Sequence, residues 1–223
     1  MHHMQMSPDM VLPELHADIA RYYTAKVLAH GASPEGVDWG CVPTQELRFV
    51  QLLRVCDFTE PLSINDLGCG YGALLGFLRK RHRRSVIDYL GIDLSPAMVD
   101  QAQHLWRRYR RATFSVGANN PRIADYSVAS GLFNVQQDQP AAWWTLFVQQ
   151  VLTGLLATSR KGFAVNFLAP LSREMQPKPG LYRTAPDIWM EYCATTLGQQ
   201  PELLTGYGLN EFTLLVRRAP AAS

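Results

Sequence analysis

An acidic residue stands two positions before a glycine-rich turn in the first third of the chain. Asp66 precedes Gly68 in the stretch INDLGCGYGALLGFL (residues 64–78), where glycines also occupy positions 70 and 72. The apolar residues before the glycines follow a strand pattern, and those after them follow a helix pattern. Glycine at such a junction lets backbone N–H groups approach a ligand at the positive end of a helix. The stretch therefore predicts a ligand-binding loop with a carboxylate beside it.

The position of Asp66 selects between two kinds of ligand. The spacing Gly68-x-Gly70-x-x-Ala73 fits the relaxed dinucleotide fingerprint, but a dinucleotide would bring two phosphate charges close to Asp66. Two like charges about 4 Å apart cost about 4 kcal/mol at an effective dielectric constant of about 20. S-adenosylmethionine instead carries an ammonium, which Asp66 can bind directly or through water while the loop amides hold the carboxylate. The alternative is that Asp66 only caps its own turn.

A second acid ends the next predicted strand, in the stretch YLGIDLSPAM (residues 89–98). Because the carboxyl ends of neighbouring parallel strands face one crevice, we expect Asp93 to accept both hydroxyls of an adenosine ribose. It would serve a nicotinamide ribose equally well, so it supports nucleoside binding without choosing the cofactor. Ser95 and Pro96 fit the N-cap and first turn of a helix, and an acid before a helix start is the alternative role for Asp93.

Together these two stretches resemble the first two motifs of the class I S-adenosylmethionine-dependent methyltransferases, and the resemblance extends over about residues 62–218. It implies an α/β fold with a doubly wound, mostly parallel sheet of seven strands and a C-terminal antiparallel hairpin. It also implies S-adenosyl-L-methionine as cofactor, S-adenosyl-L-homocysteine as product, and an in-line displacement at the methyl carbon. Because the sulfonium is an excellent leaving group, alignment and exclusion of water can supply most of the acceleration, and no base is obligatory.

The resemblance also implies a set of cofactor-binding residues. In this family an acid often follows the third strand beside the adenine amine, but Ala118 stands at that place, so Asn119 or backbone groups would substitute. Ser130 and Gly131 would lie at the tip of the fourth strand, facing cofactor and acceptor. Phe133 would stack near the adenine or wall the acceptor site, or else belong to the core. The implied cofactor-binding residues are Asp66, Gly68, Cys69, Gly70, Asp93, Leu94, Met98, Asn119, Ser130, Gly131 and Phe133.

The elements that position these residues divide the chain into three parts. Residues 1–61 are predicted to form a short helical cap, residues 62–218 the methyltransferase core, and residues 219–223 a tail. Strands that alternate with helices are typical of a parallel sheet covered on both faces. The last two runs, 201–208 and 209–218, are joined by a short turn and must pair antiparallel. The other predicted strands are 62–67, 86–93, 112–116, 125–132 and 160–168, and the core helices are 72–82, 96–109, 140–157 and 185–197.

The cap and the loop after the fifth strand must lie above the strand tips and supply the acceptor wall. The cap is predicted as a helix over residues 13–31, a loop over 30–43 and a helix over 44–56. The segment 166–186 suits a lid or a plain surface loop. Catalytic residues stay unassigned. The candidates are Tyr22, His30, Trp39 and Tyr182, with Tyr23, Asn166, Arg173 and Glu174 as further wall residues.

Composition restricts the partners and the setting. The 223 residues are 47% hydrophobic and carry a formal net charge of +2, which suits one core and gives little reason to expect a polyanionic partner. The four cysteines form no C-x-x-C pair, so we expect neither a metal site nor a disulfide framework. No apolar run suits a membrane span and no signal-peptide pattern begins the chain, so a cytoplasmic protein is expected. Nothing indicates an oligomeric state.

The expected acceptor is a small molecule, methylated at oxygen or nitrogen, and two alternatives stay open. The runs RKRHRR (79–84) and RRYRR (107–111) hold nine of the 21 lysines and arginines and could bind RNA. Each run ends a helix that follows a strand, so we expect it at the sheet edge opposite the cofactor crevice, where basic residues also complement the helix dipole. Nucleic acid is therefore not favoured. The other alternative is a protein that binds the cofactor without catalysis.

Overall fold

One sheet of seven strands forms the centre of the fold, in a computed structural model that describes residues 8–171, 176 and 178–218. The strands are β1 (Leu62–Leu67), β2 (Ile87–Asp93), β3 (Ala112–Val116), β4 (Ala124–Ala129), β5 (Ser159–Leu168), β6 (Glu202–Leu204) and β7 (Glu211–Arg217). Their order is β3-β2-β1-β4-β5-β7-β6. Strands β1 to β5 are parallel, whereas β7 is antiparallel to both β5 and β6. This confirms the predicted mostly parallel seven-stranded sheet with a C-terminal antiparallel hairpin.

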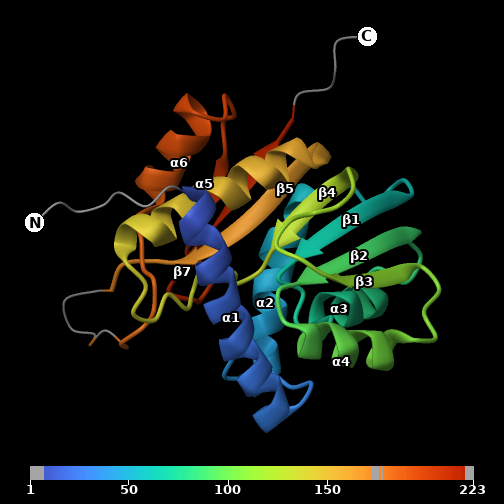
Figure 1. Ribbon diagram of the computed structural model, residues 1–223. Coiled ribbons are helices and arrows are strands. Elements are labelled where there is room, and N and C mark those ends of the chain that lie inside the picture. The colour runs from blue at the N-terminus through green and yellow to red at the C-terminus, as the bar shows by residue number, and fades with distance from the viewer. Residues whose placement is uncertain (1–7, 172–175, 177, 219–223) are drawn as a thin grey trace, which may run out of the picture.

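Helices cover both faces of this sheet. They are α1 (Pro8–His30), α2 (Val42–Leu52), α3 (Ala73–Arg81), α4 (Pro96–Trp106), α5 (Ala141–Ala157) and α6 (Pro186–Thr195), with short 3-10 helices η1 (Glu35–Val37) and η2 (Leu53–Val55). Figure 1 shows α5 and α6 on one side of the sheet, α3 and α4 on the other, and α1 between the two groups. One apolar cluster joins α1, α5 and α6 to the sheet, and a second joins α2 and α3 to it. Within the described ranges, no helix is long and apolar enough to cross a membrane.

Two helices begin at the same edge of the sheet. α3 starts directly after Gly72, and α4 starts after Ser95, whose Oγ accepts the backbone N–H of Met98 at 3.3 Å. A proline in the first turn completes the predicted N-terminal signal of α4. β1 is flanked by β2 on one side and β4 on the other, so the strand order changes direction here. Such a switch point opens a crevice at the carboxyl ends of the strands.

The N-terminal segment packs across this crevice. The hydroxyls of Thr24 on α1 and Ser95 are hydrogen-bonded at 2.7 Å. The prediction that this helix begins at Pro13 is wrong, because Pro13 lies inside α1. Val11 and Leu15 on either side of it are 1% and 0% exposed, and their packing offsets the helical hydrogen bond that proline cannot donate.

Two strands end earlier than predicted because glycines with a positive φ follow them. β4 ends at Ala129 rather than at residue 132, because Gly131 has a φ of +69° and strand geometry requires a negative φ. β6 covers only three residues of the predicted run 201–208, in which Gly206 and Gly208 have φ values of +71° and +84°. In both places a turn replaces the end of the strand.

Candidate active site

A pocket lies at the carboxyl ends of β1, β2, β3 and β4. Each of these strands contributes residues that come directly after its end. The glycine loop supplies residues 68–70, the turn after β2 supplies Leu94, the turn after β3 supplies Gly117 and Ala118, and the turn after β4 supplies residues 130–132. The crevice predicted from the two motifs is therefore present, at the position where an open α/β sheet binds its ligand.

Asp66 lies at the bottom of this pocket with only 2% of its surface exposed. The phenol of Tyr89 donates a hydrogen bond to Oδ2 of Asp66. Burial raises the pKa of Asp66 to about 7; the hydrogen bond from Tyr89 opposes this increase, and the nearby charge of Asp93 adds to it. A cationic ligand group placed beside Asp66 would favour its charged form. The position therefore suits an ammonium and disfavours a phosphate.

Tyr89 is a site residue that the motifs do not single out. In the parallel register Gly91 lies beside Asp66 and Tyr89 lies beside Ile64, so Tyr89 and Asp66 point to the same side of the sheet. Burial and the charge of Asp66 raise the pKa of Tyr89, which keeps the phenol protonated as a donor. The sequence does contain a signal that could have identified Tyr89. Side chains alternate between the two faces of a strand, so Tyr89 and Gly91 share one face of β2 with the predicted site residue Asp93.

Asp93 fastens the glycine loop through its carboxylate. Its Oδ2 accepts the backbone N–H of Gly70 at 2.9 Å, and its Oδ1 accepts the backbone N–H of Ser95 at 2.9 Å. Burial raises the pKa of Asp93, and these backbone hydrogen bonds oppose the increase. Because each carboxylate oxygen has two lone pairs, both oxygens keep one for a further donor such as a ribose hydroxyl.

The cap closes the pocket above the glycine loop. It contributes Ile19, Tyr23, Val37, Trp39, Gln45 and Phe49. The Arg48 guanidinium lies 3.8 Å from the centroid of the Trp39 ring. A Cβ on Gly131 would lie 2.3 Å from Cζ2 of Trp39, and the φ of Gly131 is +69°, so both the approach and the backbone require glycine here. Of the predicted acceptor-wall candidates, Trp39 and Tyr23 are therefore brought to the pocket.

Other candidates lie outside the lining that the described residues form. His30 is exposed at the end of α1, and Asn119 is exposed after β3, where Gly117 and Ala118 face the pocket in its place. Tyr182 packs near Trp144, with ring centroids 6.3 Å apart. Tyr22 lies beside a separate small cavity between α1 and the segment after β4.

Phe133 and Asn166 belong to the buried interior. Phe133 is 0% exposed and stacks on Phe167 with ring centroids 4.9 Å apart, so of its two expected positions it takes the one in the core, and it is not part of the described pocket lining. A turn at Gly131 precedes it: the φ of Gly131 is +69°, and its carbonyl accepts the backbone N–H of Asn134 at 3.2 Å. Asn166 of β5 is fully buried behind the pocket wall. Outside the described residues lie Arg173 and Glu174.

Phe147 and Val151 of α5 also line the pocket, although the sequence pattern does not distinguish them as site residues. Both belong to the apolar cluster that packs α5 on the sheet. A helical position that faces the core and one that faces a pocket in that core have the same periodicity. Sequence alone therefore offers no signal for this part of the wall.

The fold and the pocket define a class of protein. A seven-stranded sheet in this order, with β7 antiparallel, a glycine loop after β1 and acids at the ends of β1 and β2, is the architecture of the class I, Rossmann-like methyltransferases. Residues 64–138 match the family model of the methyltransferase domain. The chain is 41% identical over 167 residues to "Putative methyltransferase Rv1506c" of Mycobacterium tuberculosis, a match that covers 75% of this chain and 99% of that protein. This chain therefore belongs to the S-adenosylmethionine-dependent methyltransferase family.

Solved structures share this fold at low sequence identity. The magnesium protoporphyrin IX methyltransferase of Synechocystis PCC 6803, with bound S-adenosylhomocysteine, is 14% identical with a TM-score of 0.54, over 98% of this chain and 90% of that chain. The phosphoethanolamine N-methyltransferase 1 of Haemonchus contortus, in complex with phosphoethanolamine and S-adenosylhomocysteine, is 10% identical with a TM-score of 0.66, over 99% of this chain and 51% of that chain. At these identities the likeness establishes the fold and leaves the acceptor undetermined.

Proposed function

We propose that this protein transfers the methyl group of S-adenosylmethionine to an oxygen or nitrogen atom of an uncharged small molecule. The observation that carries this proposal is the lining of the pocket. Among its described residues there is no lysine, arginine, histidine or glutamate, and the only charged side chains are Asp66 and Asp93, both beside the glycine loop. Apart from Gln45, the cap side of the pocket is apolar and aromatic. Such a wall fits a compact acceptor with little charge, because a buried charge without a partner is costly.

The proposed cofactor position follows from the polar groups of the pocket. Asp66 would bind the ammonium, and the backbone N–H groups of residues 68–70 would face the carboxylate. Asp93 would accept the ribose hydroxyls through its remaining lone pairs. The adenine would lie between the apolar side chains of Leu94 and Leu132, close to Ala118, with backbone groups of this turn as its polar partners.

S-adenosylmethionine, when bound, supplies an electrophilic methyl carbon and a thioether leaving group. The side chains of the pocket supply position and exclusion of water, which are worth about 7–11 kcal/mol in favourable cases. Burial raises the pKa values of the Tyr23, Cys69 and Tyr71 side chains, so near neutral pH they keep their protons. They can hold a hydrogen bond to the acceptor but cannot remove its proton. The acceptor best suited to this wall is an amine of low basicity, which is neutral and nucleophilic near neutral pH, or a neutral hydroxyl that gives its proton to water as it reacts.

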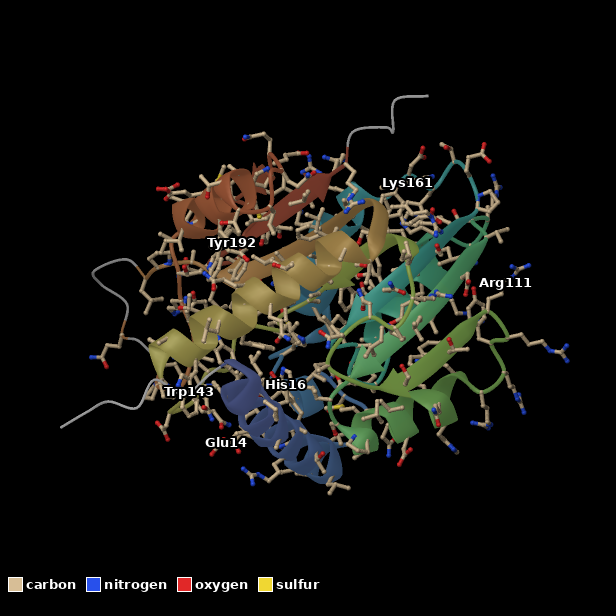
Figure 2. All side chains as sticks on the ribbon, turned by 45° about the horizontal axis from the view of Figure 1, so that its top comes forward. Glu14, His16, Arg111, Trp143, Lys161 and Tyr192 are labelled. Carbon is tan, nitrogen blue, oxygen red and sulfur yellow. The ribbon has the colours of Figure 1, made fainter. Side chains whose placement is uncertain are left out.

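The location of the basic runs supports a small-molecule acceptor over RNA. Residues 79–84 end α3 and precede β2, and residues 107–111 follow α4 and precede β3, so both runs lie at the amino edge of the strands. Figure 2 shows Arg111 at the end of the molecule away from His16 on α1. A nucleic acid held by these runs would have to wrap around the sheet to present a base to the pocket.

The test is incubation with S-adenosylmethionine labelled in its methyl group, together with either a small-molecule cell extract or total RNA. We expect label in a small molecule, and we expect Asp66→Ala to abolish its transfer. Asp100→Ala is the matched control, since Asp100 is an exposed acid on α4 outside the pocket. Label on RNA alone would support the nucleic-acid alternative. Tight binding of the cofactor without any transfer would support a non-catalytic protein.

A further inference from the structure

Three buried polar groups from distant parts of the chain form one hydrogen-bonded series behind the pocket. The backbone N–H of Gly131 donates to Oδ1 of Asn166 at 2.7 Å. Nδ2 of Asn166 donates to Oε2 of Glu211 at 2.9 Å. Asn166 and Glu211 are 0% and 5% exposed. The series therefore links the turn after β4 to the first residue of β7 through buried groups.

The series continues into the cap. Nε of Arg48 donates to Oε1 and Oε2 of Glu211 at 2.9 Å and 2.8 Å, and Nη2 of Arg48 also pairs with Oε1. Nη1 of Arg48 donates to the backbone carbonyl of Thr44, one turn earlier in α2. The Arg48 guanidinium lies against the Trp39 ring at 3.8 Å, and Trp39 in turn packs on Gly131. The contacts thus form a closed ring that begins and ends at the pocket wall.

The charge of Glu211 determines which atoms of this ring donate hydrogen bonds and which accept them. A carboxylate can only accept hydrogen bonds, so the Asn166 amide must turn its Nδ2 toward Glu211 and leave its Oδ1 for the N–H of Gly131. The same carboxylate holds the guanidinium that supports Trp39. A glutamine at this position could donate as well as accept, and it would no longer define which way the Asn166 amide faces.

We propose that Glu211 and Arg48 are positioning residues that fix the backbone of Gly131 and the ring of Trp39, and so set the shape of the pocket. This inference rests on the proposed function in that the pocket must bind S-adenosylhomocysteine. Neither residue lines the pocket, and they act through Asn166 and Trp39. A buried ion pair often contributes little net stability compared with apolar residues, so stability alone does not account for one at this position.

A pair of isosteric substitutions tests which of positions 166 and 211 donates the hydrogen bond and which accepts it. Glu211→Gln removes the carboxylate, and Asn166→Asp places a second carboxylate against Glu211. The double variant Asn166→Asp/Glu211→Gln restores complementarity between these two positions, because the carboxylate at position 166 would accept from the N–H of Gly131 and from the amide at position 211, and the buried pair keeps one negative charge. It leaves Arg48 with one acceptor oxygen at position 211 instead of two, so it separates the Gly131 side of the ring from the Trp39 side. We expect each single variant to bind S-adenosylhomocysteine about tenfold more weakly by calorimetry, and the double variant to recover the part of that loss that comes from the Gly131 side of the ring, about threefold.

The second measurement is hydrogen exchange of the Gly131 amide by NMR. We expect it to be about tenfold faster in Glu211→Gln and close to the original rate in the double variant. Glu202→Gln is the matched control, because Glu202 pairs with Arg217 on the exposed end of the same hairpin. If Asn166→Asp does not fold, Glu211→Gln and the double variant still give the comparison.

Two results would overturn the inference. One is a lower unfolding temperature in the single variants with unchanged affinity and unchanged exchange at Gly131, which would make the ring merely structural. The other is a double variant no better than the single variants. Failure of the cofactor assignment gives a different pattern, because the original protein itself would then not bind S-adenosylhomocysteine. Failure of methyl transfer to small molecules alone would leave these binding and exchange measurements unchanged.

Discussion

The charge of Asp66 changes with pH in the range where the protein must bind its ligand. Its pKa is raised to about 7 by burial, whereas an unfolded aspartate titrates at about 4. A carboxyl whose pKa is raised on folding binds its proton more tightly in the folded state, so its favourable contribution to stability is present at low pH and is lost as pH rises from about 4 to about 7. Binding of an ammonium has the opposite dependence, because it requires the charged form.

Affinity for S-adenosylhomocysteine should therefore increase with pH. Between pH 6 and pH 8 we expect the dissociation constant to fall by about tenfold, because the proton on Asp66 must leave before the ammonium can pair with it. Calorimetry at constant ionic strength measures this. Asp66→Asn should bind weakly at every pH and give a flat profile. A wild-type profile that is also flat would contradict the assignment of the ammonium to Asp66.

Tyr89→Phe should move this profile to higher pH. The lost hydrogen bond favours the charged form of Asp66, so its removal raises the pKa of Asp66 further and weakens binding at pH 7 by about threefold to tenfold. The loss should become smaller above pH 8, where Asp66 is charged in both proteins. Tyr126→Phe is the control, because the Tyr126 hydroxyl accepts the backbone N–H of Asp57 and lies away from the pocket. Equal effects of the two substitutions would indicate a general loss of packing.

The cap loop and the turn after β4 meet at Gly131. The cap loop places Trp39 where a Cβ of residue 131 would lie, so the position of this loop and the turn after β4 depend on each other. Gly206 has almost the same φ, +71° against +69°, but a Cβ there would meet nothing within 4 Å. Substitution of each glycine by alanine therefore distinguishes two contributions to the loss of stability. Both substitutions carry the cost of a left-handed backbone, and only the one at Gly131 adds the clash with Trp39.

Gly131→Ala should be more damaging than Gly206→Ala. Each substitution carries a backbone cost of about 1–2 kcal/mol in the free energy of unfolding. Gly131→Ala should add a further loss of about 1–3 kcal/mol and should weaken binding of S-adenosylhomocysteine, because Trp39 must move out of the pocket wall. Urea unfolding and calorimetry measure the two effects. Equal destabilisation by the two substitutions, with binding intact in both, would show that the Trp39 contact is not important.

The core elements were predictable because each carries its own local signal. The alternation of apolar runs and the glycine loop fix the order of strands and helices in residues 62–218, and Ser95 with Pro96 marks the start of α4. Boundaries were less accurate where tertiary packing overrides a local signal. Pro13 reads as a helix start, but buried neighbours on both sides carry the helix through it.

The binding site was predictable only where it is local in sequence. Asp66 and Asp93 could be placed at one crevice because each lies at the carboxyl end of a parallel strand that leads into a helix, so the fold alone brings them together. Arg48, Asn166 and Glu211 could not, because their relation depends on which parts of α2, β5 and β7 are packed together. Arg48 and Glu211 are 163 positions apart, and a single sequence contains no local pattern that would identify them as an ion pair.

The whole molecule combines a basic amino edge with an acidic pocket at the other edge of the sheet. Residues 79–84 and 107–111 carry nine positive charges, and the pocket carries the carboxyl groups of Asp66 and Asp93 without a basic residue among its described lining. The electrostatic field of such a charge distribution influences which ligands approach the pocket. A ligand that places an ammonium beside Asp66 is compatible with the pocket, whereas a diphosphate would lie next to two carboxyl groups.

Thermal unfolding with two ligands tests this selectivity on the whole protein. S-adenosylhomocysteine at about 100 times its dissociation constant should add about 2.7 kcal/mol to the free energy of unfolding, which raises the unfolding temperature by several degrees for a protein of this size. NAD at the same concentration should add little, because its phosphates would face Asp66 across the glycine loop. Asp66→Ala should remove the shift with S-adenosylhomocysteine, while Asp100→Ala should keep it. A shift with NAD and none with S-adenosylhomocysteine would contradict the use of this pocket for the methyl donor, since both ligands carry an adenosine and differ chiefly in the charge placed beside Asp66.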